Sequence, residues 1–175
     1  MMRALALLAL LVPCVACDQA TKALAVLHLK GSAGDGVVGD GFFRLVYAEN
    51  PGAFLGLGRA LPDALRTALF VVGVAAVLIG VAVFALRRRP PWPVFLGLGL
   101  LVAGGLGNLV DRVARDGRVV DFAVLRVGPL QTGIFNVADV QIVAAAFLLV
   151  TGTWHRRRAD EDAGGGHPPD PVAAG

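Results

Sequence analysis

Four long apolar blocks alternate with polar segments along the 175-residue chain. The blocks cover residues 4–27, 65–86, 92–110 and 134–154. A helix needs around 20 apolar residues to cross a bilayer core, so each block is long enough to be a transmembrane helix. The pattern predicts four spans, and an even number of spans places both ends of the chain on the same side of the membrane.

The two polar segments on the other side predict structure outside the bilayer. Within residues 28–64, the turn-rich stretch "GSAGDGVVGDG" precedes "FFRLVYAEN", whose aromatic and β-branched residues predict a strand. Residues 111–133 form a second loop, in which "RDG" and "VGPLQTG" mark turns. The predicted fold class is an all-α membrane protein with four transmembrane helices and a small extracytoplasmic β-sheet or cradle.

The C-terminal segment "RADEDAGGGHPPDPVAAG" is rich in glycine, proline and charge. Such a composition cannot bury enough apolar surface to fold. We therefore expect residues 159–175 to be a disordered cytoplasmic tail, and residues 1–158 to form a single membrane domain.

Composition and charge agree with a membrane protein. Hydrophobic residues make up 56% of the chain, charged residues only 17%, and the mean hydropathy is +0.70. The net charge of +3 is too small to indicate a nucleic-acid partner. Arginines cluster at block ends, in "LRRRPP" (86–91) and "HRRR" (155–158), which is typical of cytoplasmic flanks. Both termini are therefore predicted to be cytoplasmic.

The third block carries a small residue at every fourth position, namely Gly99, Ala103 and Gly107. Small residues at this spacing let helix backbones approach closely in lipid. Packing alone is sufficient to account for these three residues.

Polar residues in and beside the spans are predicted to fall at one membrane face. They are Asp18, Lys22, Asn50, Asn108, Asp111, Arg112, Asp121, Asn136 and Asp139. Ionisable residues at membrane depth are functional candidates because partners must offset their desolvation. A convergent set at one face is stronger evidence than any single member.

Residue types narrow the chemistry that this face can perform. The three histidines, His28, His155 and His167, are scattered without metal-ligand spacing, so we expect no metal and no cofactor. The single serine, Ser32, lies in a glycine-rich turn, which gives no support to nucleophilic catalysis. Paired carboxylates are the hydrolytic apparatus that remains.

Asp121 in "VVDF" and Asp139 in "FNVAD" can form such a pair. One carboxylate would take a proton from water while the other, protonated, polarises the scissile carbonyl, because two adjacent carboxylates cannot both ionise. A shared proton would also lower the cost of placing Asp139 at the head of an apolar helix. The alternative is structural: each aspartate caps a helix or pairs with Arg112.

The first block contains "CVAC", with Cys14 and Cys17, which has two functional interpretations. It has the C-x-x-C redox spacing, although no βαβ pattern surrounds it. It could also be a lipoprotein signal sequence with Cys17 as the lipid-attachment residue, although three more membrane-length blocks follow. The bland interpretation is a pair of buried apolar cysteines.

Five motifs in order resemble those of the lipoprotein signal peptidase (signal peptidase II) family. They are "DQATK" (18–22), "NPGAF" (50–54), "GGLGNLVDR" (104–112), "VVDF" (119–122) and "FNVAD" (135–139). The resemblance covers about residues 10–150. It implies a bacterial cytoplasmic (inner) membrane aspartyl protease with both termini cytoplasmic and its active site at the extracytoplasmic face. The implied activity is cleavage of a diacylglyceryl-modified prolipoprotein just before its lipidated cysteine.

The resemblance also assigns site residues. It implies that Asp121 and Asp139 are the catalytic pair. The supporting or substrate-binding positions that it implies are Asp18, Lys22, Asn50, Gly52, Gly104, Asn108, Arg112, Asn136 and Ala138. We expect Lys22 to pair with Asp18 or a helix end, the two asparagine amides of the spans to hold the substrate backbone, and Arg112 to orient a carboxylate or a substrate carbonyl. Asp111 is predicted to be a solvated or ion-paired residue without a catalytic role.

Expected partners are prolipoprotein substrates and membrane lipid, with no nucleic acid, and the enzyme is expected to be a monomer. Two departures from the family pattern leave altered substrate preference or inhibitor sensitivity open. "NPGAF" is one alanine shorter than the usual motif, and Val140 and Gln141 follow the second aspartate. The alternative function is a non-enzymatic four-span transporter or scaffold, which would need a polar path across the bilayer.

Overall fold

The computed structural model describes residues 1–31, 36–38, 41–52 and 61–164. Four of its helical segments are long and apolar enough to cross a membrane. The segments that lie outside the described residues include most of the turn-rich stretch before "FFRLVYAEN", the end of "NPGAF" and the end of the predicted tail.

The four predicted spans are confirmed, with longer helices than the apolar blocks alone. Helix α1 runs from Met2 to Leu29, α4 from Trp92 to Ala114 and α5 from Val137 to Gly164. The second span consists of α2 (Asp63–Ala68), the π-helical turn η2 (Leu69–Gly73) and α3 (Val74–Arg88). The predicted tail, residues 159–175, overlaps the end of α5.

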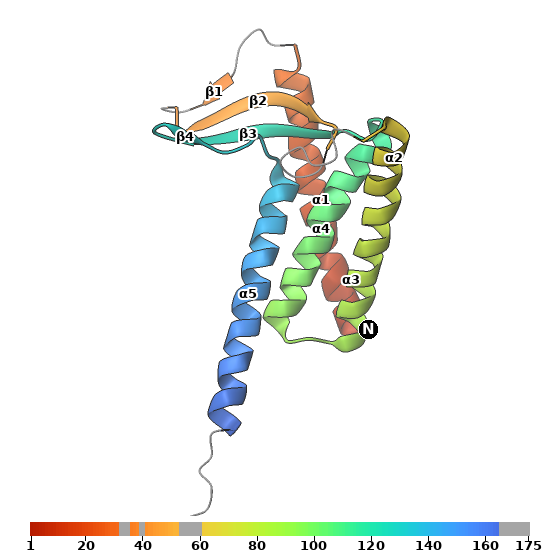
Figure 1. The fold of residues 1–175 in the computed structure, drawn as a ribbon, viewed down its shortest axis with the longest axis vertical. Helices are drawn as coiled ribbons and strands as arrows, with labels where there is room; N and C mark the ends of the chain where they lie inside the picture. Colours follow the sequence, from red (N-terminus) through yellow and green to blue (C-terminus); the bar gives the residue numbers. More distant parts are fainter. Residues whose placement is uncertain (32–35, 39–40, 53–60, 165–175) are drawn as a thin grey trace, which may run out of the picture.

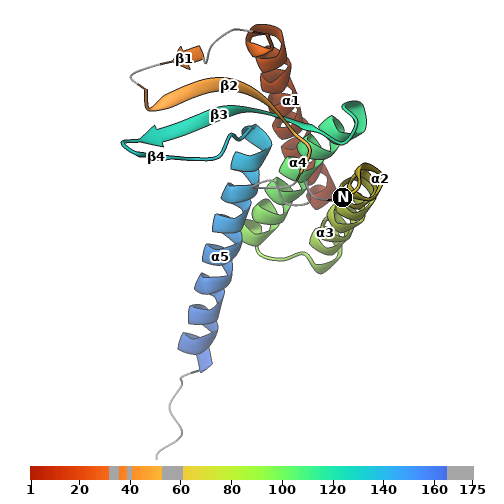
Figure 2. The ribbon, with the colours of Figure 1, turned by 45° about the horizontal axis from the view of Figure 1, so that its top comes forward.

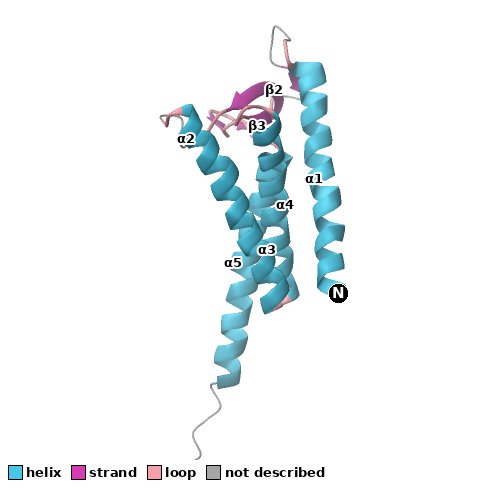
Figure 3. Cartoon of the chain, turned by 90° about the vertical axis from the view of Figure 1, so that its right-hand side faces the viewer, coloured by secondary structure: helices cyan, strands magenta, loops and turns pink. Residues whose placement is uncertain are grey.

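Helix α4 is the centre of the bundle and packs against α1, α3 and α5. Figure 3 shows α1 on one side of α4 and the sheet at one end of the helices. The small residues of α4 face its neighbours, because a side chain at Gly99 would meet Leu10 of α1 and one at Gly107 would meet Asp18 of α1, and Ala103 is fully buried. The predicted packing role of the Gly99-xxx-Ala103-xxx-Gly107 ridge is confirmed.

A four-stranded antiparallel sheet, in the order β1-β2-β3-β4, lies across one end of the bundle (Figure 1). Strands β1 (Gly36–Val38) and β2 (Phe43–Asn50) form an antiparallel hairpin in the predicted small sheet, and β2 pairs along its length with β3 (Val119–Val127). The short β4 (Leu130–Gln131) completes the sheet. Figure 2 shows β2 and β3 side by side, reaching out beyond α5.

The segment 111–133, predicted as a loop with turns, is more ordered than expected. Its first residues, through Ala114, continue α4, and "VVDFAVLRV" forms β3. The valine-rich sequence of this segment favours a strand by itself, and the fold adds its antiparallel pairing with β2, which lies far earlier in the chain. The N-terminus, the turn between α3 and α4, and the lower part of α5 all lie at the end opposite the sheet (Figure 1).

Candidate active site

Asn136 makes hydrogen bonds to both predicted catalytic aspartates. Its side-chain Nδ2 donates to Asp121 Oδ1 at 2.7 Å, and its backbone N–H donates to Asp139 Oδ2 at 3.2 Å. Asp121 lies on β3, whereas Asp139 lies in the first turn of α5. Strand β3 and the first turn of α5 therefore place both carboxylates next to Asn136.

The beginning of α5 explains why Asp139 is held so firmly. The Asp139 N–H donates to Asn136 Oδ1 at 3.0 Å, while Asp139 Oδ2 accepts the Asn136 N–H. This reciprocal pair is a capping box, which satisfies two backbone donors at a helix start. The structural alternative for Asp139, helix capping, is thus correct, and it coexists with a position beside Asp121. Asp121 lies within a strand, so the capping alternative is wrong for it.

Asparagine amides bind the remaining carboxylate oxygens. Asn108 Nδ2 donates to Asp139 Oδ1 at 3.0 Å, and Asn50 Nδ2 donates to Asp121 Oδ2 at 3.1 Å. Asn136 Nδ2 also lies 3.1 Å from Asn108 Oδ1. Each of the four carboxylate oxygens therefore accepts a hydrogen bond from an asparagine, and the orientation of both carboxylates is fixed.

Burial changes the acidity of Asp121, whose side chain is only 4% exposed. Desolvation raises the pKa of Asp121 to about 6, and the negative charge of Asp139 adds to the increase. Hydrogen bonds from Asn50 and Asn136, and the positive charge of Lys22, act in the opposite direction. A carboxyl group with this pKa can hold a proton much closer to neutral pH than an exposed aspartate.

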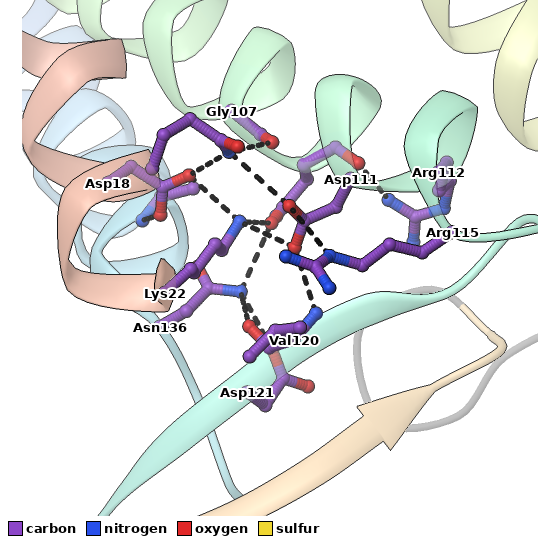
Figure 4. A network of polar contacts seen from close by, with 12 residues as sticks. Asp18, Lys22, Gly107, Asp111, Arg112, Arg115, Val120, Asp121 and Asn136 are labelled. Carbon is purple, nitrogen blue, oxygen red and sulfur yellow. Dashed lines mark hydrogen bonds and ion pairs between the residues drawn. The ribbon is translucent and has the colours of Figure 1, made fainter. Parts of the chain in front are cut away.

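A buried ion cluster of Asp18, Lys22 and Asp111 lies next to Val120 and Asn136 (Figure 4). Lys22 Nζ lies 2.8 Å from Asp18 Oδ2 and 3.3 Å from Asp111 Oδ2, and the three side chains are at most 1% exposed. The predicted pairing of Lys22 with Asp18 is confirmed. The interpretation of Asp111 as a solvated residue is wrong, whereas its alternative, an ion-paired residue, is correct.

The ion cluster contacts the residues that precede each aspartate. Asp18 Oδ1 accepts the Ala138 N–H at 2.9 Å, and Asp111 Oδ2 accepts the Val120 N–H at 2.9 Å. Lys22 Nζ also donates to Asn108 Oδ1 at 3.0 Å. The cluster therefore positions the backbone beside Asp139 and Asp121, in addition to neutralising its own charges.

Arg112 binds backbone oxygens. Its NH2 group donates to the Gly52 carbonyl at 2.8 Å and its NH1 group to the Asn108 carbonyl at 3.2 Å. The guanidinium carbon lies 5.3 Å from the centre of the Phe70 ring, in the π-helical turn η2. Gly52 N–H donates in turn to Asn50 Oδ1 at 3.0 Å. Arg112 thus ties α4 to the chain after β2, next to the amide that binds Asp121.

Gly104, Gly107 and Ala138 provide the close helix contacts that this site requires. A Cβ atom at Gly104 would lie 2.5 Å from the Ala138 carbonyl oxygen, and one at Gly107 would lie 2.5 Å from Asp18 Oδ2. Ala138 is fully buried. Larger residues at these positions would push α4 away from the start of α5, where Asp139 lies.

Two contributors to this network were missed from the sequence. Gln19 Nε2 donates to the Gly107 carbonyl at 3.0 Å and to Asp18 Oδ2 at 3.1 Å. The second is Asp111, as described above. The available signal was helical spacing, because Asp111 follows Asn108 by three residues and therefore shares its face of α4.

The cysteine motif and the departures after Asp139 concern helix packing. Both cysteines are free, Cys14 half-buried and Cys17 exposed, so the interpretation as a buried pair is wrong. The Cys14 carbonyl accepts a hydrogen bond from Gln141 Nε2 at 3.0 Å. Gln141 therefore joins α5 to α1, and Val140 is exposed. Within the described residues, no group of three His, Cys, Asp or Glu side chains is placed to hold a metal ion.

A sequence model of the family described as "Signal peptidase (SPase) II" matches residues 10–155 of this chain. The chain belongs to the signal peptidase II family. One relative, the lipoprotein signal peptidase of Chlorobium luteolum, is 40% identical over 158 residues, covering 85% of this chain and 90% of that protein. The lipoprotein signal peptidase of Pelotomaculum thermopropionicum is 44% identical over 133 residues, covering 75% of this chain and 80% of that protein.

Two solved structures share the fold of this chain. A bacterial membrane enzyme structure determined by the in meso method matches with a TM-score of 0.74 and 23% identity, covering 93% of each chain. A second such structure has a TM-score of 0.72 and 26% identity, covering 85% of this chain and 92% of the other. Membership of a peptidase family disfavours the alternative of a non-enzymatic transporter or scaffold.

Proposed function

We propose that this chain is a lipoprotein signal peptidase, an aspartyl endopeptidase that removes signal peptides from diacylglyceryl-modified prolipoproteins. The observation that carries the proposal is that Asn136 bonds both Asp121 and Asp139, at 2.7 and 3.2 Å. Two carboxylates that share one neighbour, Asp121 buried and Asp139 half-buried, form the apparatus that an aspartyl protease needs, and family membership agrees with it.

The proposed reaction uses one water and one shared proton. In the reactive form Asp121 holds the shared proton, which its pKa, raised by burial to about 6, favours, and it donates a hydrogen bond to the scissile carbonyl. Asp139, bound at both oxygens by Asn108 and Asn136, takes a proton from the water that attacks the carbonyl carbon. The tetrahedral intermediate collapses when Asp139 passes that proton to the leaving nitrogen, which breaks the peptide bond, and Asp121 recovers the proton that it shared with the carbonyl oxygen.

The position of the site supports a membrane-embedded substrate. Asp139 lies in the first turn of a span and Asn108 lies within another, so the reacting bond must reach the membrane boundary. A diacylglyceryl group would hold the cysteine of the prolipoprotein at that depth, and cleavage would fall just before it. The supporting roles of Asp18, Lys22, Asn50, Gly52, Gly104, Asn108, Arg112, Asn136 and Ala138 belong to this proposal.

We further propose that both termini are cytoplasmic and that the site faces the extracytoplasmic side of the bacterial inner membrane. Arg3 and the arginines of residues 87–89 lie at the end of the bundle opposite the sheet (Figure 1). Basic residues close to span ends are retained in the cytoplasm. The enzyme would act as a monomer, with residues 1–158 as its membrane domain and lipid around its exposed apolar faces.

The decisive experiment is cleavage of a diacylglyceryl-modified prolipoprotein by the purified protein, with the unlipidated precursor as control. We expect cleavage of the lipidated form only. Asp121→Asn and Asp139→Asn should each lower kcat by about 10³-fold or more, because each removes an acid–base group. Asn at position 139 can still accept the Asn136 N–H, so the helix start is preserved.

Wild-type turnover by either variant would remove that aspartate from the mechanism, and equal cleavage of both precursors would contradict the proposed substrate. EDTA should leave the activity unchanged. Activity lost in EDTA and restored by zinc would contradict an aspartyl mechanism.

A further inference from the structure

Asp111 is a buried carboxylate that the proposed reaction does not use. Its side chain is 1% exposed, and burial of a charge is costly unless partners compensate for it. Its neighbours are the Val120 N–H at 2.9 Å, Lys22 Nζ at 3.3 Å, Arg115 Nε at 3.6 Å and Gln19 Nε2 at 3.4 Å. Asp111 therefore needs several partners to remain buried, and Figure 4 shows it beside Lys22, Arg115 and Val120.

The first contribution concerns the backbone of β3. Val120 is fully buried and directly precedes Asp121. Because Asp111 Oδ2 accepts the Val120 N–H, α4 holds the strand one residue away from the reacting carboxylate. A displacement of about 1 Å at a reacting group can lower a rate about 10²-fold, so this bond affects catalysis without any contact with substrate.

The second contribution concerns charge. Lys22 has two carboxylate neighbours, Asp18 and Asp111, and it also donates to Asn108 Oδ1. Asn108 Nδ2 binds Asp139, so the ammonium lies one amide away from the aspartyl pair. If Asp111 were neutral, Lys22 would have one carboxylate neighbour instead of two. Its positive charge would then favour the ionised form of Asp121 and Asp139 more strongly.

We propose that Asp111 is a positioning residue for the peptidase reaction. It holds the backbone of Val120, next to Asp121, and it balances the charge of Lys22 so that the aspartyl pair keeps its shared proton. This inference rests on the proposed function. It contradicts the prediction from sequence that Asp111 has no part in the mechanism. Asp18 is its counterpart on the other side of the cluster, because it accepts the Ala138 N–H beside Asp139.

Asp111→Asn separates charge from geometry. The new amide oxygen can still accept the Val120 N–H, but the negative charge is gone. We expect the alkaline limb of the pH profile of kcat/KM to move to lower pH by about half a unit or more. Asp111→Ala removes the acceptor as well, and kcat should fall by about 10²-fold. KM should stay within about twofold of wild type in both variants, because Asp111 does not touch substrate.

Arg115→Gln provides the opposite change. Arg115 lies just after α4, is partly exposed and is a cationic neighbour of Asp111. Its removal leaves the Asp111 charge less compensated, so the alkaline limb should move to higher pH. Asp116→Asn is the matched control, because Asp116 is an exposed carboxylate in the same turn. It should leave both the limb and kcat at the wild-type values.

The charged groups around Asp111 and the aspartyl pair come from four elements. They are Asp18 and Lys22 on α1, Arg112 on α4 with Arg115 after it, Asp121 on β3, and Asp139 on α5. These charges explain why the alkaline limb of the pH profile should move in opposite directions in Asp111→Asn and Arg115→Gln. Loss of a merely structural ion pair would lower stability but would not move the limb in two directions.

Wild-type cleavage of the lipidated precursor establishes the proposed function independently of this inference. If wild type cleaves and Asp111→Asn keeps the wild-type limb, the role in charge balance is wrong. If Asp111→Ala and Asp111→Asn have equal kcat, the role in positioning Val120 is wrong. If Asp111→Asn does not fold, the pH profile of Arg115→Gln tests the role in charge balance. An alkaline limb moved to higher pH supports that role, and an unmoved limb contradicts it.

Discussion

Asparagine is the residue type that holds the proposed catalytic pair. Asn50, Asn108 and Asn136 together bind all four oxygens of Asp121 and Asp139. A neutral amide orients a carboxylate without adding charge. Lysine or arginine at the same positions would favour full ionisation of both carboxylates, and the proton that the proposed reaction requires would be lost. The one nearby lysine, Lys22, is itself neutralised by two carboxylates.

Asn50 offers a test of this balance at the residue scale. Because the pKa of Asp121 is raised to about 6, protonated enzyme is lost as pH rises through that value. We expect kcat/KM to fall on the alkaline side, with an apparent pKa that belongs to the coupled pair. The Asn50 hydrogen bond lowers the pKa of Asp121, so Asn50→Ala should raise it and move the alkaline limb to higher pH.

The measurement is the pH profile of kcat/KM for a fluorogenic lipopeptide. Gln131→Ala, on the exposed strand β4, removes an amide far from the pair and serves as control. If the alkaline limb of the Asn50→Ala profile moves to lower pH, or does not move, the assignment of the raised pKa to Asp121 is wrong.

At the scale of elements, the site depends on how closely α4 approaches α1 and α5. Backbones that approach this closely exclude side chains from the contact, which is why small residues recur along α4. Gly107 lies against Asp18 of α1, and Gly104 lies against the Ala138 carbonyl of α5. The π-helical turn η2 contributes Phe70, whose ring lies beside Arg112. Helix packing thus places the polar groups of α1, α4 and α5, whereas the sheet places Asn50 and Asp121.

Gly104→Ala should disrupt this packing. Its Cβ would lie 2.5 Å from a backbone oxygen, which cannot rotate away as a side chain would. We expect destabilisation of about 1–3 kcal/mol from overpacking, and a lower kcat because Asp139 follows Ala138. Gly80→Ala is the matched control, since a Cβ at Gly80 meets nothing within 4 Å. Thermal unfolding in detergent and the cleavage assay measure both effects, and equal behaviour of the two variants would contradict the role of Gly104.

At the scale of the whole molecule, the two ends of the bundle differ in chemistry. One end carries the sheet, the aspartyl pair and the ion cluster, whereas the other carries the N-terminus and the turn between α3 and α4 with its arginines (Figure 1). This polarity matches a protein that receives its substrate from one side of the membrane. Each end of the bundle also has exposed residues at which the orientation of the protein in the membrane can be measured.

Cysteine labelling tests the proposed orientation. In a Cys14→Ala/Cys17→Ala background, Arg88→Cys marks the end of α3 and Pro129→Cys marks the β3–β4 turn, where both native residues are exposed. A membrane-impermeant maleimide added to intact spheroplasts should label position 129 and should label position 88 only after lysis. The reverse pattern would place the site in the cytoplasm and overturn the proposed topology.

The sequence predicted the four spans, the strand at β2 and the order of the site motifs. These depend on local properties, because apolar length determines whether a helix can cross a bilayer and β-branched and aromatic residues favour a strand. The pairing of Lys22 with Asp18 was also predictable, since residues four apart share a helix face.

Tertiary structure decided what the local pattern could not. Val119–Val127 is rich in β-branched residues, but its pairing with β2 is a tertiary contact, and Asp111 becomes part of the site because Lys22 and Val120 come to it from other elements. Asn136 meets Asp121 only when the sheet lies over the start of α5. Hydropathy and propensity are read along the chain, whereas hydrogen bonds between distant elements form only once the helices have packed. The span pattern is therefore a property of the sequence, and the meeting of the two aspartates is a property of the fold.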